Sequence, residues 1–134
     1  MQGINYNWFG EGILFADDDI YSHMLLEKIF QRTGAKLFHA HNGHEAIDIM
    51  KKSGHEINVA IIDIIMPGLN GYEVAYLIDK NFPDVSLIAY TADTVSLDIE
   101  KCRQCGFIKL LTKPTLPNRI LSEINNLMTV KNKL

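Results

Sequence analysis

One stretch of the chain, residues 58–71, constrains the fold more than any other. It begins with the apolar run Val59 to Ile62, rich in β-branched residues, which is typical of a strand buried on both faces of a parallel sheet. Asp63 follows where the strand should end, and Pro67, Gly68 and further turn-forming residues then turn the chain at once. Taken alone, Asp63 is best interpreted as a helix cap. Its position at a strand's carboxyl end, without deep burial, is also where ligands bind in open α/β sheets.

Strand-like and helix-like segments alternate along the rest of the chain. Apolar runs predict strands at residues 13–16, 36–40, 59–62, 85–90 and 107–111. Helical spacing predicts a helix with Met24, Leu25, Ile29 and Phe30 that stops at Gly34, and further helices at residues 45–52, 72–81, 96–104 and 116–128. Such alternation implies parallel strands with right-handed crossovers, and the units are too few for an eight-stranded barrel. The sequence therefore predicts an α/β fold, a flavodoxin-like doubly wound (βα)5 open sandwich with a five-stranded parallel sheet in the order 2-1-3-4-5.

Length and composition bound the class of protein. The 134 residues suggest one domain, with residues 1–11 as an N-terminal arm or linker, 12–130 as the folded domain and 131–134 as a frayed C-terminus. The net charge of −3 and the absence of a Lys or Arg run give no indication of nucleic acid binding. No apolar stretch approaches the ~18 residues of a membrane span, and the first residues do not resemble a signal peptide. Two cysteines fit a reducing compartment, so we expect a cytoplasmic protein.

Polar side chains follow four of the predicted strands at their carboxyl ends. Asp17 and Asp18 follow the first strand and Asp63 the third, while Thr91 and Lys113 follow the fourth and fifth. In a flavodoxin-like order these ends converge near one switch point. Carboxylates held close together repel and favour a cation, and hard oxygen ligands favour Mg²⁺. A hydroxyl and an ammonium beside the metal complete a cradle for a phosphoryl group, with Asp63 as a nucleophile that can form an acyl phosphate.

With these residues in place, the chain resembles a response-regulator receiver domain of bacterial two-component signalling. The resemblance covers residues 13–127. Each motif is weak alone, but their order and their positions at strand ends are specific. The matching residues are the pair Asp17-Asp18, the motif Asp63-Ile64-Ile65-Met66-Pro67 with Gly71, the pair Thr91-Ala92, and Lys113-Pro114.

The resemblance implies a role for each acidic residue of the predicted site. Asp63 would accept a phosphoryl group from the phosphohistidine of a histidine kinase. Asp18 would bind Mg²⁺ directly, and Asp17 would bind it mainly through water. Asp63 and the backbone carbonyl of Ile65 would be further metal ligands. Asp19 does not belong to this set, and we expect it to cap the first helix.

The resemblance also implies roles at the other strand ends. Thr91 would bond one phosphoryl oxygen and shift inward with its loop, and Lys113 would pair with another. The Lys113-Pro114 peptide bond would be cis. Such a domain is a signalling module rather than an enzyme, with Mg²⁺-dependent self-phosphorylation and slow autodephosphorylation as its only chemistry.

One position departs from the pattern of the family. Receivers usually carry Tyr or Phe three positions before the lysine, and this chain has Leu110 there. Leucine is smaller and wholly apolar, so we expect it to stay buried in both states. The aromatic rotamer switch coupled to Thr91 cannot operate in its usual form.

Several other residues suggest chemistry but have simpler interpretations. Cys102 and Cys105 have the spacing of a redox pair, yet they lie at a predicted helix C-terminus, where the dipole does not favour a thiolate. His39 and His41 share one face of a predicted strand, but no nearby residue completes a metal site, so we expect exposed histidines there and at His44. Gly10-Glu11-Gly12 precedes a strand, so it is not a dinucleotide motif. Trp8 is interpreted as a local packing anchor.

Two other classes of function remain as alternatives. A haloacid-dehalogenase-like phosphohydrolase also forms an aspartyl phosphate, and residues 17–19 contain its Asp-x-Asp pattern. That enzyme would need acidic metal ligands after its lysine, and no Asp follows Pro114. A pseudo-receiver, a binding module of the same fold without phosphorylation, is opposed by the presence of all the site residues.

The expected partners are a histidine kinase, a histidine phosphotransfer domain, or both. No output domain follows Met128, so we expect no DNA binding by this chain, which is either a single-domain regulator or a piece of a longer protein. The segment around Tyr6 and Trp8 resembles the one leading into the C-terminal receiver of hybrid sensor kinases.

Overall fold

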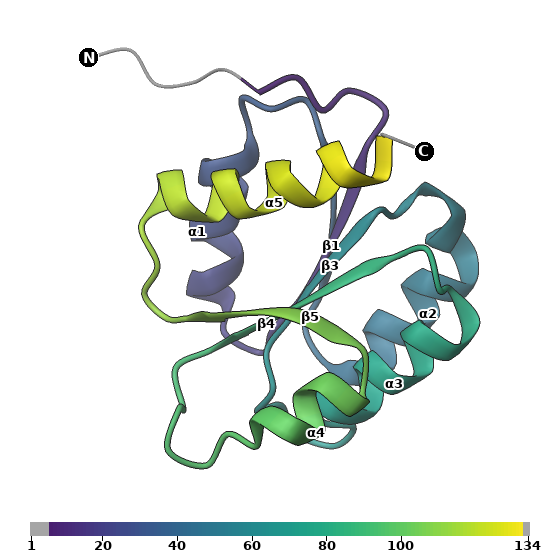
Figure 1. The fold of residues 1–134 in the computed structure, drawn as a ribbon, viewed down its shortest axis with the longest axis vertical. Coiled ribbons are helices and arrows are strands. Elements are labelled where there is room, and N and C mark those ends of the chain that lie inside the picture. Colours follow the sequence, from purple (N-terminus) through teal and green to yellow (C-terminus); the bar gives the residue numbers. More distant parts are fainter. Residues whose placement is uncertain (1–5, 133–134) are drawn as a thin grey trace.

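The computed structural model describes residues 6–132, in which a parallel sheet lies between two layers of helices (Figure 1). Over these residues the five strands have the order β2-β1-β3-β4-β5, which confirms the predicted fold. The strands are β1 (Gly12–Ala16), β2 (Lys36–Ala40), β3 (Val59–Ile62), β4 (Ser86–Thr91) and β5 (Phe107–Thr112). The helices are α1 (Ile20–Phe30), α2 (Gly43–Ser53), α3 (Gly71–Asn81), α4 (Ile99–Gln104) and α5 (Pro117–Asn132), with a 3-10 turn at Gly54–Glu56.

The alternation of side chains along the central strands divides the core in two. Leu14 and Ala16 of β1 face a cluster that includes Ala46 of α2, the buried face of α3, and Cys102 of α4. Ile13 and Phe15 of β1 face the opposite cluster, formed with α1 and α5. Because both faces of a central strand are covered, its sequence is apolar throughout rather than alternating. Figure 1 shows this arrangement, with α1 and α5 on one side of the sheet and α2, α3 and α4 on the other.

Trp8 ties the segment before β1 to the helical layer of α1 and α5. Its side chain is buried, its ring packs against Phe30, and its Nε1–H donates to Asn125 Oδ1 at 3.2 Å. The Trp8 backbone N–H also donates to the carbonyl of Thr33. Trp8 is therefore a packing anchor as predicted, but its contacts reach α5 and are not local. Residues 1–5 of the predicted arm, and 133–134 of the predicted frayed end, lie outside the described residues.

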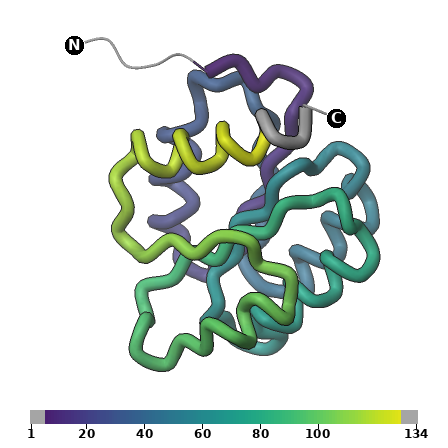
Figure 2. The backbone as a smooth tube through the Cα atoms, viewed as in Figure 1, coloured from purple at the N-terminus to yellow at the C-terminus, as the bar shows by residue number. Residues whose placement is uncertain are grey.

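The predicted strand boundaries agree with the structure to within about one residue, but the start predicted for α4 is wrong. The expected start was residue 96, and α4 begins at Ile99. The Asp93 carboxylate accepts hydrogen bonds from the backbone of Val95 and from both the backbone and hydroxyl of Ser96, which holds these residues in a turn. Asp98 then caps the helix by accepting from the Lys101 N–H at 3.0 Å. Figure 2 shows residues 92–98 as the green loop that projects away from the sheet before α4.

The buried face of α1 also differs from a simple apolar stripe. His23, Leu26 and Phe30 point into the core, while Met24 and Leu25 are exposed to solvent.

None of the helices in residues 6–132 is both long enough and apolar enough to span a membrane.

Candidate functional site

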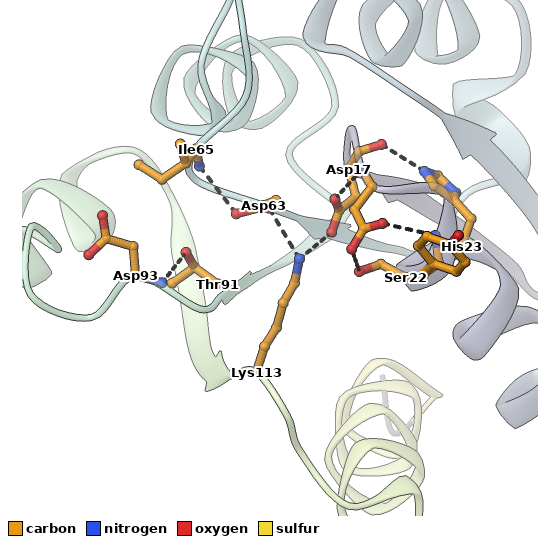
Figure 3. A network of polar contacts seen from close by, with 10 residues as sticks. Asp17, Ser22, His23, Asp63, Ile65, Thr91, Asp93 and Lys113 are labelled. Carbon is orange, nitrogen blue, oxygen red and sulfur yellow. Dashed lines mark hydrogen bonds and ion pairs between the residues drawn. The ribbon is translucent and has the colours of Figure 1, made fainter.

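The pairing of β1 with β3 brings two carboxylates together at the carboxyl edge of the sheet. Ala16 is the partner of Ile62 in the register, and the Asp63 N–H donates to the Ala16 carbonyl at 2.9 Å. Asp17, the next residue after β1, therefore lies beside Asp63, the next residue after β3 (Figure 3). Carboxylate oxygens of Asp17, Asp18 and Asp63 lie within 4.8 Å of one another. The three acidic residues predicted to converge do so.

Asp17 is fixed by hydrogen bonds on both carboxylate oxygens. The side chain is fully buried; Oδ1 accepts from the Asp19 N–H at 2.8 Å, and Oδ2 accepts from the Lys113 ammonium at 2.5 Å. Asp18 is exposed next to it. Asp19 caps α1 by accepting from the Tyr21 N–H at 3.0 Å, as predicted. The consecutive aspartates therefore have different environments, with one buried, one open to solvent, and one occupied by the helix.

Lys113 holds the two buried carboxylates together from the end of β5. Its Nζ donates to Asp17 Oδ2 and, at 3.2 Å, to Asp63 Oδ2 (Figure 3). Burial by itself would lower the pKa of Lys113, but the hydrogen bonds and negative charges of both aspartates outweigh burial and raise it. Lys113 therefore remains a cation in this site. The Lys113-Pro114 peptide bond is cis, as the resemblance implied.

Asp63 is more deeply buried than its position before a turn predicts, so the expectation of shallow burial is wrong. Only 7% of the residue is exposed. Ile64 and Met66 fold back into the core, which draws the turn over the carboxylate. The close approach of α3 contributes to this burial and requires glycine at its first position. A Cβ on Gly71 would lie only 2.3 Å from the Asp63 carbonyl oxygen. Burial raises the pKa of the Asp63 carboxyl, and the Lys113 charge opposes this increase.

Thr91 and Ile65 lie on either side of Asp63. Thr91 is buried at the end of β4, and its Oγ1 accepts from the Asp93 N–H at 3.3 Å. The Ile65 N–H donates to Asp63 Oδ1 at 3.2 Å, while the Ile65 side chain is 53% exposed. Figure 3 shows Asp63 with Ile65 above it, Lys113 below it and Thr91 on the side away from Asp17. The carboxylate oxygens of Asp63 are therefore each held by one donor, and the hydroxyl of Thr91 comes from the neighbouring strand.

The chemistry of this cluster fits a divalent cation with hard oxygen ligands. Three carboxylates with one ammonium carry a net negative charge, and Asp18 leaves oxygen ligands open to solvent. Mg²⁺ is bound in proteins through a few carboxylates while it retains several waters. The acidic residues of this receiver-like site can therefore hold a metal ion.

Sequence reasoning missed His23, which becomes part of the surroundings of the site. This buried histidine of α1 contacts the Asp17 carbonyl through Nε2 at 2.7 Å and faces His39 of β2. Burial lowers the pKa of His23. The prediction that His39 is simply exposed is therefore wrong, whereas His41 and His44 are exposed. The signal that could have identified His23 is its place on an amphipathic helix, where it shares the buried face with Leu26 and Phe30.

Two other predictions concern residues on the α4 side. Cys102 and Cys105 are free cysteines at the C-terminal end of α4, and burial raises the pKa of both thiols, which disfavours the reactive thiolate.

Leu110 is half-buried rather than fully buried, because it packs only partly against the core on the α4 side of the sheet. The prediction for Leu110 is therefore wrong in degree.

The fold agrees with comparisons to known proteins. The chain is 28% identical to the response regulator SaeR of Staphylococcus aureus over 117 residues, which are 87% of this chain and 50% of SaeR. The chain thus spans about half the length of the curated relatives it matches.

Solved structures of the same fold include a CheY-like receiver domain protein from Methanospirillum hungatei JF-1. Its TM-score is 0.84 at 22% identity, with 92% of this chain and 97% of that chain covered. The chemotaxis protein CheY4 of Vibrio cholerae has a TM-score of 0.80 at 22% identity, with 87% of this chain and 98% of that chain covered. At such identities the likeness shows the fold alone.

The sequence profile of one family matches nearly the whole folded region, residues 13–125. Together with the strand order and the acidic cluster at the carboxyl edge of the sheet, this match shows that the chain belongs to the response regulator receiver domain family.

Proposed function

We propose that this receiver domain accepts a phosphoryl group on Asp63 from the phosphohistidine of a histidine kinase or histidine phosphotransfer domain, with Mg²⁺ as cofactor. The observation that carries the proposal is the position of Lys113, whose ammonium contacts both Asp17 and Asp63. Asp63 is the one carboxylate of the cluster next to an ammonium, a strand-end hydroxyl and two further carboxylates. We expect the reaction to take place in the cytoplasm.

The transfer exchanges one phosphorus bond for another. An oxygen of Asp63 attacks the phosphorus, the O–P bond forms, the N–P bond of the phosphohistidine breaks, and the released imidazole takes up a proton. Asp17, Asp18, Asp63 and the Ile65 carbonyl would hold Mg²⁺, which supplies positive charge to the transferred oxygens when bound. Lys113 pairs with one phosphoryl oxygen, and the Thr91 hydroxyl donates to another after a short inward shift.

The protonation states of the site suit these roles. The raised pKa of Lys113 keeps its charge available for an anionic phosphoryl group. Asp63 is desolvated, which raises its pKa, so a cation beside it favours the ionised form that acts as the nucleophile. The buried position of Asp17 fixes one side of the metal site, while the exposed position of Asp18 leaves its oxygens free to ligate.

A phosphohydrolase of the haloacid-dehalogenase type has less support. Glu123 is the acidic side chain that follows Lys113 in the sequence, and it forms an ion pair with Lys109 at 2.6 Å. It therefore has another partner and is not placed as a metal ligand. Asp19, the second aspartate of the Asp-x-Asp pattern, is occupied as the cap of α1.

Incubation with acetyl phosphate and Mg²⁺ tests the proposal and separates the alternatives. We expect a phosphorylated species that persists and that is absent from Asp63→Asn. Rapid turnover with continuous phosphate release would favour the phosphohydrolase, and no reaction would favour a pseudo-receiver. Asp48→Asn, at an exposed position of α2, is the matched control and should be labelled as the wild type is.

We further propose that the main output is phosphoryl transfer to a histidine phosphotransfer domain. Four large apolar side chains are exposed on α1, directly after the acidic cluster: Ile20, Tyr21, Met24 and Leu25. A partner whose histidine must reach Asp63 can cover this face. Position 110 also holds Leu instead of the aromatic residue that, in receivers, usually links phosphorylation to the surface around α4, β5 and α5.

Relay is tested by mixing the phosphorylated chain with a histidine phosphotransfer domain encoded near it. Met24→Lys should slow transfer by at least tenfold without changing labelling by acetyl phosphate, because the small donor does not need α1. Val95→Lys is the control, since Val95 is exposed on the loop before α4. Equal slowing by both variants, or by neither, would contradict docking on α1.

A further inference from the structure

Two histidine rings face each other on the side of α1 next to the acidic cluster. His23 of α1 is buried, and His39 of β2 has a partly exposed side chain. Their Nδ1 atoms lie 2.7 Å apart, and their ring centroids lie 4.9 Å apart. The His41 ring also packs against His23, with a centroid separation of 4.4 Å. This histidine group shares no side chain with the proposed phosphoryl site.

The other nitrogen of each ring is held by an oxygen that can only accept. His23 Nε2 lies 2.7 Å from the Asp17 carbonyl oxygen, and His39 Nε2 lies 2.6 Å from Glu27 Oε2. Each Nε2 must therefore carry a hydrogen and donate it. In the neutral rings, both Nδ1 atoms then present lone pairs to each other.

Two lone pairs at 2.7 Å repel unless a positive charge lies between them. A shared proton satisfies this requirement in the metal-free protein. A metal ion also satisfies it once the rings move slightly apart, because imidazole binds a metal through the same lone pair. The arrangement therefore requires a cation between the rings.

We propose that His23 and His39 form a binding site for a divalent transition-metal ion that prefers imidazole, such as Zn²⁺, Ni²⁺ or Cu²⁺. Histidines that bind metals usually donate their other N–H to a carboxylate or a backbone carbonyl, which fixes the ring and its tautomer. Both kinds of acceptor are present, one for each ring. Mg²⁺ prefers oxygen ligands, so the two sites select different ions.

The geometry needs only a small adjustment to accept such an ion. Zinc lies about 2.0–2.1 Å from histidine nitrogens, so tetrahedral coordination places two such nitrogens roughly 3.3 Å apart. The present separation is 2.7 Å, and rotation of the partly exposed His39 ring can provide the difference. Water fills the remaining positions, and His41, with an exposed side chain held by Glu45, can rotate to supply a third nitrogen.

The test is a Zn²⁺ titration by calorimetry on tag-free protein, with excess Mg²⁺ present to occupy the acidic cluster. We expect one zinc per chain in the wild type and at least tenfold weaker binding in His39→Asn. Glu27→Ala removes the acceptor of the His39 Nε2–H but no ligand, and we expect it to weaken binding about tenfold or more. His55→Asn, at an exposed position after α2, is the matched control and should bind as the wild type does.

Nitrogen-15 spectra of the imidazole rings then identify the ligand atoms. We expect zinc to shift the Nδ1 resonances of His23 and His39 while their Nε2 atoms stay protonated. Absence of zinc binding at micromolar concentrations would overturn the proposal and leave a shared proton as the cation. Binding that survives in a folded His39→Asn variant would assign zinc to another group, such as Cys102 and Cys105, and would also overturn it.

Discussion

The Asp63 side chain experiences two opposing effects. Burial and the nearby charge of Asp17 favour its neutral form, and Lys113 favours its ionised form, with burial dominating so that the pKa is raised. A carboxyl group with a raised pKa binds a proton more tightly in the folded protein than in the unfolded chain. Its favourable contribution to stability is thus complete below the unfolded pKa and is lost as the pH rises through the folded pKa.

This sign gives a prediction for Asp63→Asn in EDTA. At pH 7 the variant lacks the buried charge, so its free energy of unfolding should exceed that of the wild type. The difference should shrink as the pH falls through the raised pKa toward the ordinary value of about 3.8–3.9. Urea denaturation at pH 7 and pH 4 measures both values. A variant that is less stable at pH 7, or a gain that does not depend on pH, would contradict the balance of effects at Asp63.

Substitution of Asp18 should have opposite effects on the stability of the metal-free and the Mg²⁺-bound protein. Without metal, Asp18→Asn removes one of three mutually repelling charges, so we expect the free energy of unfolding to rise by up to about 1 kcal/mol. With Mg²⁺ the order should reverse, because only the wild type gains full stabilisation by a ligand that binds the native state. Melting temperatures over a Mg²⁺ titration check this. An unchanged titration would exclude Asp18 as a ligand.

Ile65 should protect the acyl phosphate from water. Its apolar side chain is half-exposed beside Asp63, and its N–H contacts the carboxylate. Asp93 could orient water, but its carboxylate is engaged by Ser96, whose hydroxyl bond lowers the Asp93 pKa. We expect Ile65→Asn to shorten the lifetime of the phosphorylated form several-fold, and Ile108→Asn, an exposed site on β5, to leave it unchanged. A lifetime equal to or longer than that of the wild type would contradict water exclusion.

At the scale of elements, strands were easier to predict than helix boundaries. Both faces of the central strands are buried, so each strand appears in the sequence as an apolar run that ends where polar residues begin. The start of α4 could not be predicted in this way. Both Asp93 and Asp98 are suitable caps, and the choice depends on which backbone groups their side chains reach in the fold.

Leu110 of β5 occupies the position where receivers usually have Tyr or Phe, and this difference affects how phosphorylation can change the surface of the domain. Leu110 is half-buried on the α4 side of the sheet and has no ring that can exchange between a buried and an exposed rotamer, so we expect its two states to differ little in their contacts. Phosphorylation shifts an equilibrium only by its differential affinity for the two states. Amide chemical shifts with beryllofluoride should therefore change mainly near Asp63, Thr91 and Lys113. Large changes across residues 96–120, with dimer formation, would favour allosteric output over relay.

At the scale of the whole molecule, the site follows from the topology. Asp63, Asp17 and Lys113 are far apart in the sequence, and the parallel order of β1, β3 and β5 was sufficient to predict their convergence. The deep burial of Asp63 was not predictable, and for His23 the helical spacing could indicate burial but not the contact with His39. Both depend on how the turn after β3 and the helix α1 pack against the sheet, which no local pattern records.

The central claim is that Asp63 is the phosphorylated residue, and chemical mapping tests it most directly. Borohydride reduces an aspartyl phosphate to homoserine, which marks the position permanently for tandem mass spectrometry of peptides. After treatment with acetyl phosphate and Mg²⁺, we predict homoserine at residue 63 and aspartate at residues 17 and 18. Homoserine at residue 17 or 18, or an unchanged Asp63 in protein that carries phosphate, would contradict the account.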